Sequence, residues 1–309
     1  MTARVERNTG PRGERASGDS DHMDVRIYQA YYLKEQRSDL DQAFQPFDWT
    51  ANPDPRLREI AIFRAFHDRG LHRSADVSGV MSPKFGSKTM MPGRAFIDFI
   101  AENPGYDAYF VNPFPQIAYY SFNQWEQGEQ AHPGLVDRAQ RLLDHCGIAL
   151  RIDDFPRVAS DKLLYCNYWA GTPSFWDRYM GFINRLHDAI MHEMAAGERN
   201  RYFEMTFHSQ PTEFFPFIFE RMFTTYLFLH PETRALPFRH AEEHVARCCF
   251  HEFELEIVRS MRIVIDGWDL EGVFTPDRRQ TFRALNDLFA CYNRLYFKIY
   301  GDPLEMRAR

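Results

Sequence analysis

Residues 25–32 read VRIYQAYY, and they are the first of several segments on which the predicted fold class rests. Apolar and polar side chains alternate here and strand-favouring residues dominate, as expected of a β-strand. Residues 57–70 then carry apolar side chains at the spacing of an amphipathic helix and end on Gly70. Residues 75–81 form a short apolar segment typical of a buried strand. Strand, helix and strand in this order indicate the start of a parallel sheet.

The same alternation continues to about residue 150. The pattern predicts a helix over residues 93–102, a strand over 106–111 and a helix over 135–145, with a polar and aromatic loop over 40–55. We therefore expect a Rossmann-like α/β fold whose mainly parallel sheet is flanked by helices. Such sheets bind ligands beyond the carboxyl ends of their strands, so the segments that follow strands are the candidate binding segments.

The second half of the chain is predicted to be more helical. A short hydrophobic segment over 163–169 precedes expected helices over residues 174–194, 213–229, 239–264 and 277–300. No linker rich in Gly, Ser or Pro divides the chain, so we expect one compound domain over residues 24–230, with C-terminal helices over 231–309 packed on it. Residues 1–23 are polar and rich in Arg and Gly, which predicts a disordered leader and makes Met23 an alternative start.

Composition narrows the class of protein. The net charge of −6 and the pI of about 6.1 give no basic field, so we expect no nucleic-acid partner. The five cysteines are scattered without a CxxC spacing, which favours free thiols in a reducing compartment and hence a cytoplasmic protein. No apolar run approaches 18 residues, so no transmembrane helix is expected. A membrane-bound acceptor would then be met at the inner face of the membrane.

Aromatic residues make up 16% of the chain, which predicts an aromatic core or rings that stack on sugars.

Four segments together resemble a family of bacterial GT-A-like glycosyltransferases associated with surface-polysaccharide genes. They are IYQAYY at 27–32, DAYFVNPF at 107–114, CNYWAG at 166–171 with Phe175 and Trp176, and FIFERMF at 217–223. The resemblance spans about residues 24–230. It implies a GT-A-like domain and a hexosyltransferase-like enzyme. That enzyme would move a sugar from a nucleotide-sugar donor to a glycan or lipid-linked glycan acceptor.

The resemblance also implies roles for particular segments. The first strand and its loop would hold the base and ribose of the donor, which makes Gln29, Asp48 and Asn52 donor-side candidates, joined by Lys84 and Asn112 after later strands. The segment with Asn167 and Tyr168 would line the acceptor side. The helix with Glu220 and Arg221 would direct a carboxylate or a guanidinium at the reaction centre.

This chain departs from the family pattern at the metal site. The resemblance implies Mg²⁺ or Mn²⁺ on an Asp-x-Asp motif, but the strand that would carry it ends in Asn112. The literal Asp-x-Asp of the chain, Asp39 to Asp41, is typical of a solvated helix start. Metal dependence is therefore an open alternative. Without a metal, cationic side chains such as Lys84, Lys88 or Arg221 would have to neutralise the leaving diphosphate.

Glu220 is the candidate for the catalytic base, because it lies in an otherwise apolar and aromatic segment where a carboxylate needs a partner or a polar cavity. The alternative is a structural ion pair with a neighbouring arginine. Glu213 is the second candidate, although a carboxylate at a helix start also complements the helix dipole. His208, in the preceding loop, is expected to be an ordinary surface histidine.

The remaining candidates each have a structural alternative. Lys84 and Lys88 flank Gly86 and Ser87 in a pattern that suits phosphate contact or a plain exposed loop. Asn112 could bind sugar hydroxyls or form an Asx turn. Trp125 and Glu126, in a polar segment expected to be a loop, could form a sugar platform or pack that loop.

Two other functions are compatible with the sequence. Residues 240–244 read HAEEH, which matches a zinc-hydrolase pattern in which His240 and His244 would share a helical face. A non-catalytic glycan-binding protein with an aromatic groove is the other alternative. Polar residues at successive strand ends favour the enzyme.

Overall fold

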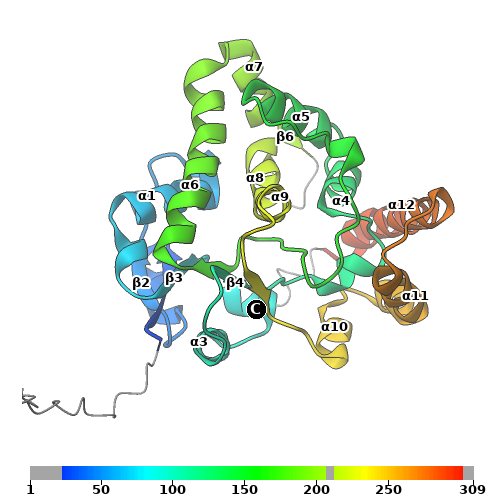
Figure 1. Cartoon of the computed structure of the whole chain (residues 1–309), viewed down its shortest axis with the longest axis horizontal. Coiled ribbons are helices and arrows are strands. Elements are labelled where there is room, and N and C mark those ends of the chain that lie inside the picture. The colour runs from blue at the N-terminus through cyan, green and yellow to red at the C-terminus, as the bar shows by residue number, and fades with distance from the viewer. Residues whose placement is uncertain (1–22, 207–211, 302–309) are drawn as a thin grey trace, which may run out of the picture.

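A mostly parallel sheet of six strands forms the centre of the molecule, as Figure 1 shows. The computed structural model describes residues 23–206 and 212–301. The strand order is β2-β1-β3-β5-β4-β8. The strands are β1 (Val25–Tyr31), β2 (Gln45–Asp48), β3 (Val77–Met81), β4 (Ala108–Phe110), β5 (Trp169–Gly171) and β8 (Ala235–Pro237). The prediction of an α/β protein with a mainly parallel sheet is therefore confirmed.

The pairing of the strands brings their carboxyl ends to one edge. Strand β1 runs parallel to both β2 and β3, and β4 runs parallel to β8. Strand β5 is antiparallel to its two neighbours, β3 and β4, so those two run in the same direction. One edge of the sheet thus collects the carboxyl ends of five strands and the amino end of β5. We call it the carboxyl edge; in sheets of this kind it is where ligands bind.

Helices cover both faces of the sheet. Figure 1 shows α3 on one side and α1 and α6 on the other. The helices are α1 (Arg58–Asp68), α2 (Phe85–Thr89), α3 (Gly93–Glu102), α4 (Gln124–Ala131), α5 (Leu135–His145), α6 (Pro173–Asp188), α7 (Ala196–Asn200), α8 (Phe214–Glu220), α9 (Met222–Leu229), α10 (Glu242–Cys248), α11 (Glu252–Glu271) and α12 (Pro276–Tyr300). Short 3₁₀ turns include η3 (Leu71–Arg73) and η4 (Pro115–Tyr119), and a second, two-stranded sheet pairs β6 (Met205–Thr206) with β7 (Thr212–Glu213).

Several predicted boundaries are corrected by the structure. The segment 40–55, expected to be a loop, contains β2, which forms because β1 offers it a parallel partner. Residues 123–129, also expected to be a loop, begin α4, because the side chain of Asn123 accepts hydrogen bonds from the backbone of Trp125 and Glu126 and caps the helix. The segment 239–264, expected to be one helix, divides into α10 and α11, where His251 caps the second helix.

Aromatic side chains fill the core between the sheet and its helices. The ring of Trp169 on β5 lies 4.3 Å from that of Trp176 on α6 and also contacts Phe175 and Phe223. The large aromatic content of the chain is therefore mainly structural.

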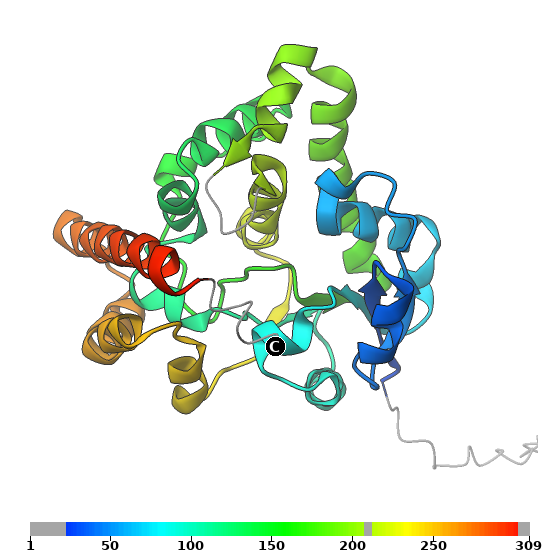
Figure 2. The ribbon, with the colours of Figure 1, turned by 180° about the vertical axis from the view of Figure 1, so that it is seen from behind.

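The C-terminal helices pack on the rest of the domain through a small second core. Figures 1 and 2 show α11 and α12 together at one end of the molecule. Buried side chains of α10, α11 and α12 join those of η4 and the segment after it in a cluster that consists of Tyr119, Phe122, Val245, Val258, Ile265 and Phe282. No helix within the described ranges has both the length and the apolar character needed to cross a membrane.

Candidate functional site

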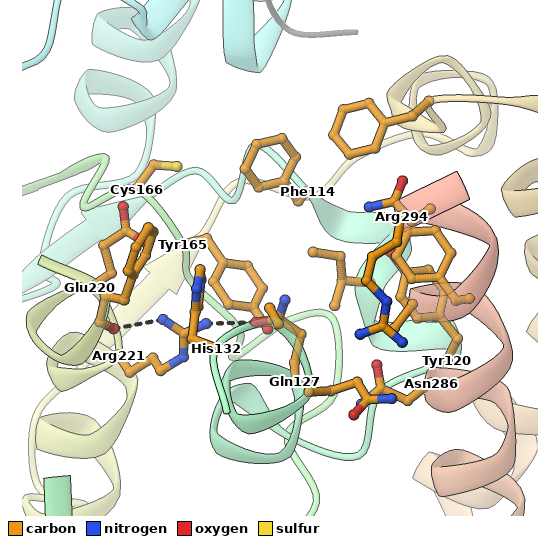
Figure 3. Close-up of a pocket in the computed structure, with 18 of the residues that line it drawn as sticks. Phe114, Tyr120, Gln127, His132, Tyr165, Cys166, Glu220, Arg221, Asn286 and Arg294 are labelled. Atoms are coloured by element: carbon orange, nitrogen blue, oxygen red, sulfur yellow. Dashed lines mark hydrogen bonds between the residues drawn. The ribbon is translucent and has the colours of Figure 1, made fainter. Parts of the chain in front are cut away.

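A cavity of about 240 Å³ lies at the carboxyl edge of the sheet (Figure 3). Its walls come from segments that are far apart in the sequence: α2 after β3, the turn after β4, the segment before β5, the junction of α8 and α9, and α4 and α12. The polar side chains that line it are Lys88, Gln127, Gln130, His132, Glu220, Arg221, Asn286, Asn293 and Arg294. The aromatic ones are Phe114, Tyr120, Tyr165, Phe217, Phe250, Phe289 and Phe297. A concave, mostly apolar pocket with a few convergent polar groups is the usual form of a small-molecule site.

Glu220 ends helix α8 with its carboxylate at the cavity. Within the described ranges this carboxylate accepts no hydrogen bond and forms no ion pair. Burial raises the pKa of Glu220, and the nearby positive charge of Lys88 opposes that shift. A carboxylate that has a raised pKa and no partner in a cavity is suited to accept a proton from a ligand.

Arg221 does not pair with Glu220, although the two are adjacent in the chain. Its guanidinium donates to the backbone oxygens of Gln124 at 2.9 Å and Phe217 at 2.6 Å, and to Oε1 of Gln127 at 2.7 Å. These partners are all neutral, so the buried positive charge of Arg221 has no carboxylate in contact. The structural ion pair considered as the alternative role for Glu220 is therefore absent from the described residues.

Lys88 reaches the same end of the cavity from α2. Its Nζ donates to Sγ of Cys166 at 3.1 Å. Burial raises the pKa of the Cys166 thiol to about 12, so the thiol stays protonated at neutral pH. Burial opposes the charge of Lys88, but the hydrogen bond to Cys166 and the carboxylate of Glu220 favour it, and the pKa of Lys88 is held well above its ordinary value. Lys88 is therefore a cation with Glu220 as its nearby carboxylate.

The backbone beside Lys88 adopts an uncommon conformation. Cys166 and Asn167 both have positive φ angles, of 63° and 54°. Left-handed backbone costs free energy in residues other than glycine and persists where the surrounding structure enforces it, often at functional sites. Next to them, the hydroxyl of Tyr165 is buried without a hydrogen-bond partner. Burial raises the pKa of Tyr165, so this hydroxyl remains a donor that a ligand could satisfy.

The opposite wall of the cavity is aromatic and carries one more cation. The rings of Tyr120 and Phe289 stack at 4.3 Å, and Phe114 lies 5.8 Å from Phe250. Arg294 on α12 is exposed and makes no ion pair with any described residue. Figure 3 shows Arg294 and Tyr120 across the cavity from Glu220 and Tyr165. Lys88, Arg221 and Arg294 therefore give the cavity a positive balance against a single carboxylate, which favours an anionic ligand.

The predicted donor-side residues lie elsewhere. Asp48 lines a separate shallow pocket beyond β2, where it accepts from the backbone and the hydroxyl of Thr50. Asn52 accepts from the indole of Trp49 in the same turn. The side chain of Gln29 is buried. It accepts a hydrogen bond from the backbone N–H of Asp41 at 2.8 Å and donates one to the backbone oxygen of Ser82 at 3.2 Å, and so links the two segments.

Two further candidates of that group are also outside the cavity lining. Lys84 is exposed at the start of α2. Asn112 accepts from the backbone N–H of Phe114, which is the Asx turn given as its structural alternative.

Among the other substrate-binding candidates, Trp125 and Glu126 of the predicted sugar platform lie in α4 rather than in a loop. Trp125 is 1% exposed, so its ring offers no face to a sugar. Glu126 pairs with Arg279 of α12 at 2.7 Å. Asn167 is buried, and the Tyr168 hydroxyl lies 3.0 Å from Oγ of Ser82. These four side chains therefore pack within the fold and do not line the cavity.

Of the predicted catalytic and binding residues, Glu220 and Arg221 line the cavity, together with Lys88 from the phosphate hypothesis. The residues that sequence reasoning missed are Tyr120, Tyr165, Gln127, His132, Asn286 and Arg294. Asn286 and Arg294 belong to α12, and no local signal distinguishes them from other polar residues of a surface helix. His208 lies outside the described residues.

The residues at the end of β4 do not fit a Mg²⁺ or Mn²⁺ site of the Asp-x-Asp kind. Asn112 stands there with its side-chain oxygen engaged by backbone. Asp107, at the start of β4, pairs with Arg178 and accepts from the backbone of Arg234. Asp41 binds the backbone of Ala43 and Gly93. Carboxylate oxygens, which these ions prefer, are thus absent from the described part of that strand end.

The zinc-hydrolase pattern is not formed as expected. His240 precedes α10, which begins at Glu242, so His240 and His244 do not share a helical face. Their rings stack at 4.6 Å, and burial lowers the pKa of His240 to about 4. Within residues 23–206 and 212–301, the three-ligand cluster that could hold a metal lies elsewhere, at His67, His72 and Asp177.

Neither a protein-family description, a curated protein nor a solved structure matches this chain.

The burial of Glu220 has a consequence for stability. Because the pKa is raised in the folded state, folding favours the protonated acid, and this contribution is lost as the pH rises through the folded pKa. Glutamine resembles the protonated acid at every pH. Glu220→Gln is therefore expected to melt at a higher temperature than the parent protein at about pH 7–8, with the difference vanishing towards about pH 4.

Thermal melts across this pH range check the prediction. Glu213→Gln is the matched control, because Glu213 stands at the N-cap position of the same helix without a side-chain capping hydrogen bond, and there its charge favours the helix dipole. The control should show no gain in melting temperature. A lower melting temperature for Glu220→Gln at neutral pH would contradict the prediction.

Proposed function

We propose that the protein is a glycosyltransferase that binds a nucleotide-activated sugar in the cavity at the carboxyl edge. One observation carries the proposal: an unpaired carboxylate, Glu220, shares an aromatic-lined cavity with the cations Lys88, Arg221 and Arg294. Sugar transfer from a nucleoside diphosphate needs a base for the acceptor hydroxyl and positive charge for the leaving diphosphate. This cavity holds both kinds of group.

The roles follow from the positions of the side chains. Arg294 is exposed and can contact phosphate. Lys88 donates one hydrogen bond to Cys166 and keeps further N–H donors for phosphate, while Arg221 adds a fixed positive charge from the cavity wall. The ring of Phe289, which is partly exposed at the cavity and stacks on the buried Tyr120, offers a surface on which a nucleoside base can stack. Glu220 accepts the proton of the acceptor hydroxyl as that oxygen bonds to the anomeric carbon, and the bond from that carbon to the diphosphate oxygen breaks.

The finer parts of the proposal rest on the sequence resemblance. These are the GT-A-like assignment, a glycan or lipid-linked glycan as acceptor, a part in surface-polysaccharide biosynthesis and action in the cytoplasm at the inner face of the membrane. The parallel sheet supports the GT-A-like assignment. In the strand order, β2 lies on one side of β1 and β3 lies on the other, so the direction in which strands are added reverses at β1. Nucleotides bind at such a switch point in other parallel sheets flanked by helices. The cationic lining supports a diphosphate contact made by side chains rather than by a metal.

A thermal-shift screen of UDP-, GDP-, CMP- and dTDP-sugars tests the proposal. One nucleotide class at about 100 times its Kd should add roughly 2.7 kcal/mol to the free energy of unfolding and raise the melting temperature by a few degrees. The shift should persist in EDTA, because no Asp-x-Asp carboxylates stand at the strand end. Lys88→Met should weaken nucleotide binding about 10- to 100-fold, since it removes a charge-assisted hydrogen bond to phosphate.

Lys84→Met is the matched control, because Lys84 lies on the same segment but is exposed and does not line the cavity. It should bind the nucleotide as the parent protein does. Stabilisation by a free glycan but by no nucleotide sugar would replace the proposal with a non-catalytic glycan-binding protein. Equal loss of affinity in both lysine variants would remove Lys88 from the site.

A further inference from the structure

His67, His72 and Asp177 converge on the far side of the domain from the cavity residues of α12. His67 lies on α1, His72 on η3 and Asp177 on α6, and these three elements pack against one another. Nε2 of His67 lies 2.9 Å from Oδ1 of Asp177, and Nε2 of His72 lies 3.1 Å from the same oxygen. The two imidazole rings stack at 4.3 Å with 20° between their planes. Two histidines thus direct the same ring nitrogen at one carboxylate oxygen.

The spacing of these atoms suits a small metal ion. A tetrahedral ion with bonds of about 2.0–2.1 Å holds its ligand atoms about 3.3 Å apart. The two nitrogen-to-oxygen distances are close to that value, and all three ligand atoms lie within 4.8 Å of one another. Lengthening these two distances by a few tenths of an ångström would bring them to the separation of ligand atoms around such an ion.

The surroundings provide the other parts that a metal site needs. The side chain of His72 is 3% exposed, whereas those of His67 and Asp177 are 23% and 39% exposed, so the cluster has a fixed base and an open side. Arg73 donates to both carboxylate oxygens of Asp177, to Oδ2 at 2.7 Å and to Oδ1 at 2.9 Å, and so orients the carboxylate, as hydrogen bonds to metal-ligating carboxylates commonly do.

We infer that His67, His72 and Asp177 form a zinc-type site with three protein ligands and a fourth position open to water. Two imidazoles and a carboxylate are a donor set that Zn²⁺ accepts. Because the ligands come from α1, η3 and α6, the ion cross-links three elements beside the sheet and stabilises the fold. This inference is independent of the proposed transferase function, since none of the three residues lines the cavity.

The test is metal binding by the purified full-length chain. After treatment with EDTA and removal of the chelator, the protein is titrated with Zn²⁺ alone, and in parallel with Co²⁺, whose visible absorption reports a tetrahedral nitrogen and oxygen environment. We expect one bound ion per chain and a rise in melting temperature of a few degrees. His67→Gln and Asp177→Asn should each lower the affinity at least about 10-fold.

Asp177→Asn separates a metal site from a hydrogen-bonded cluster. Asparagine keeps a side-chain oxygen for the two histidines but is a weaker ligand, so the variant should retain its fold by circular dichroism and lose the metal-dependent rise. His145→Asn is the matched control, because His145 pairs with Glu193 at 3.1 Å in a cluster with one histidine. His240→Asn tests the other histidine pair. An absent rise in the parent protein, unchanged binding by His67→Gln, or loss of binding by either control would overturn the inference.

Discussion

Replacing Glu220 by glutamine is expected to lower the rate of sugar transfer by about 10²- to 10⁴-fold, which is the usual contribution of a general base. The substitution keeps the size of the side chain and removes its ability to take the acceptor proton. Donor binding should remain within a few-fold of the parent value, because the phosphate contacts are assigned to Lys88 and Arg294. The readout is single-turnover release of the nucleoside diphosphate, with the donor identified by the thermal-shift screen.

The pH dependence gives a second measure of the same role. Burial raises the pKa of Glu220, so the parent rate should rise with pH through a value above that of an ordinary glutamate. Glu213→Gln, at the N-cap position of the same helix but outside the cavity lining, should keep the parent rate and profile. A Glu220→Gln enzyme that transfers sugar at nearly the parent rate would assign the base elsewhere. Loss of donor binding by that variant would instead make Glu220 a binding residue.

Replacing Arg157 by alanine is expected to cost about 3–5 kcal/mol of the free energy of unfolding, as is usual when one partner of a buried ion pair is removed. Arg157 is 4% exposed and makes a two-point contact with Asp269 of α11, with both distances at 3.0 Å. It also donates to the backbone oxygens of Ala118, Ser121 and Phe122. Alanine would leave Asp269 and these three oxygens without their donor.

Denaturant titration of the two proteins measures this difference. Arg157→Lys should not restore the parent stability, because one ammonium cannot reach both carboxylate oxygens and the three backbone oxygens. Arg141→Ala is the matched control, since Arg141 pairs with Asp137 on the exposed face of α5, and its loss should leave stability nearly unchanged. A loss below about 1 kcal/mol for Arg157→Ala would show that the apolar contacts of α11 and α12 are sufficient to hold them.

Glu220 and Arg157 differ in how far the sequence alone indicates their roles. Glu220 could be found from the sequence, because a carboxylate in a run of phenylalanines needs a reason to be there. Arg157 carries no such signal, since its partners lie 112 residues ahead and 35 to 39 residues behind. Lys88 was visible as one of two lysines after a strand, but only the structure separates it from the exposed Lys84.

The sequence by itself determined those elements whose signals are local. The helices predicted over residues 93–102 and 135–145 are α3 and α5 with the same bounds, because apolar periodicity and the breakers that follow them lie within one short segment. Strand β1 and the alternation of strands and helices were equally visible, and they were enough to predict a mainly parallel sheet.

The tertiary structure alone decided what depends on distant contacts. Strands β2 and β8 are short and exist through pairing with β1 and β4, and the antiparallel β5 is held between two strands that precede it in the chain. The far wall of the cavity comes from α12, and the carboxylate of the histidine cluster comes from a residue 105 positions after His72. Periodicity records which face of an element is buried, but it carries no information on which other element covers that face, so these sites become visible only when the chain is folded.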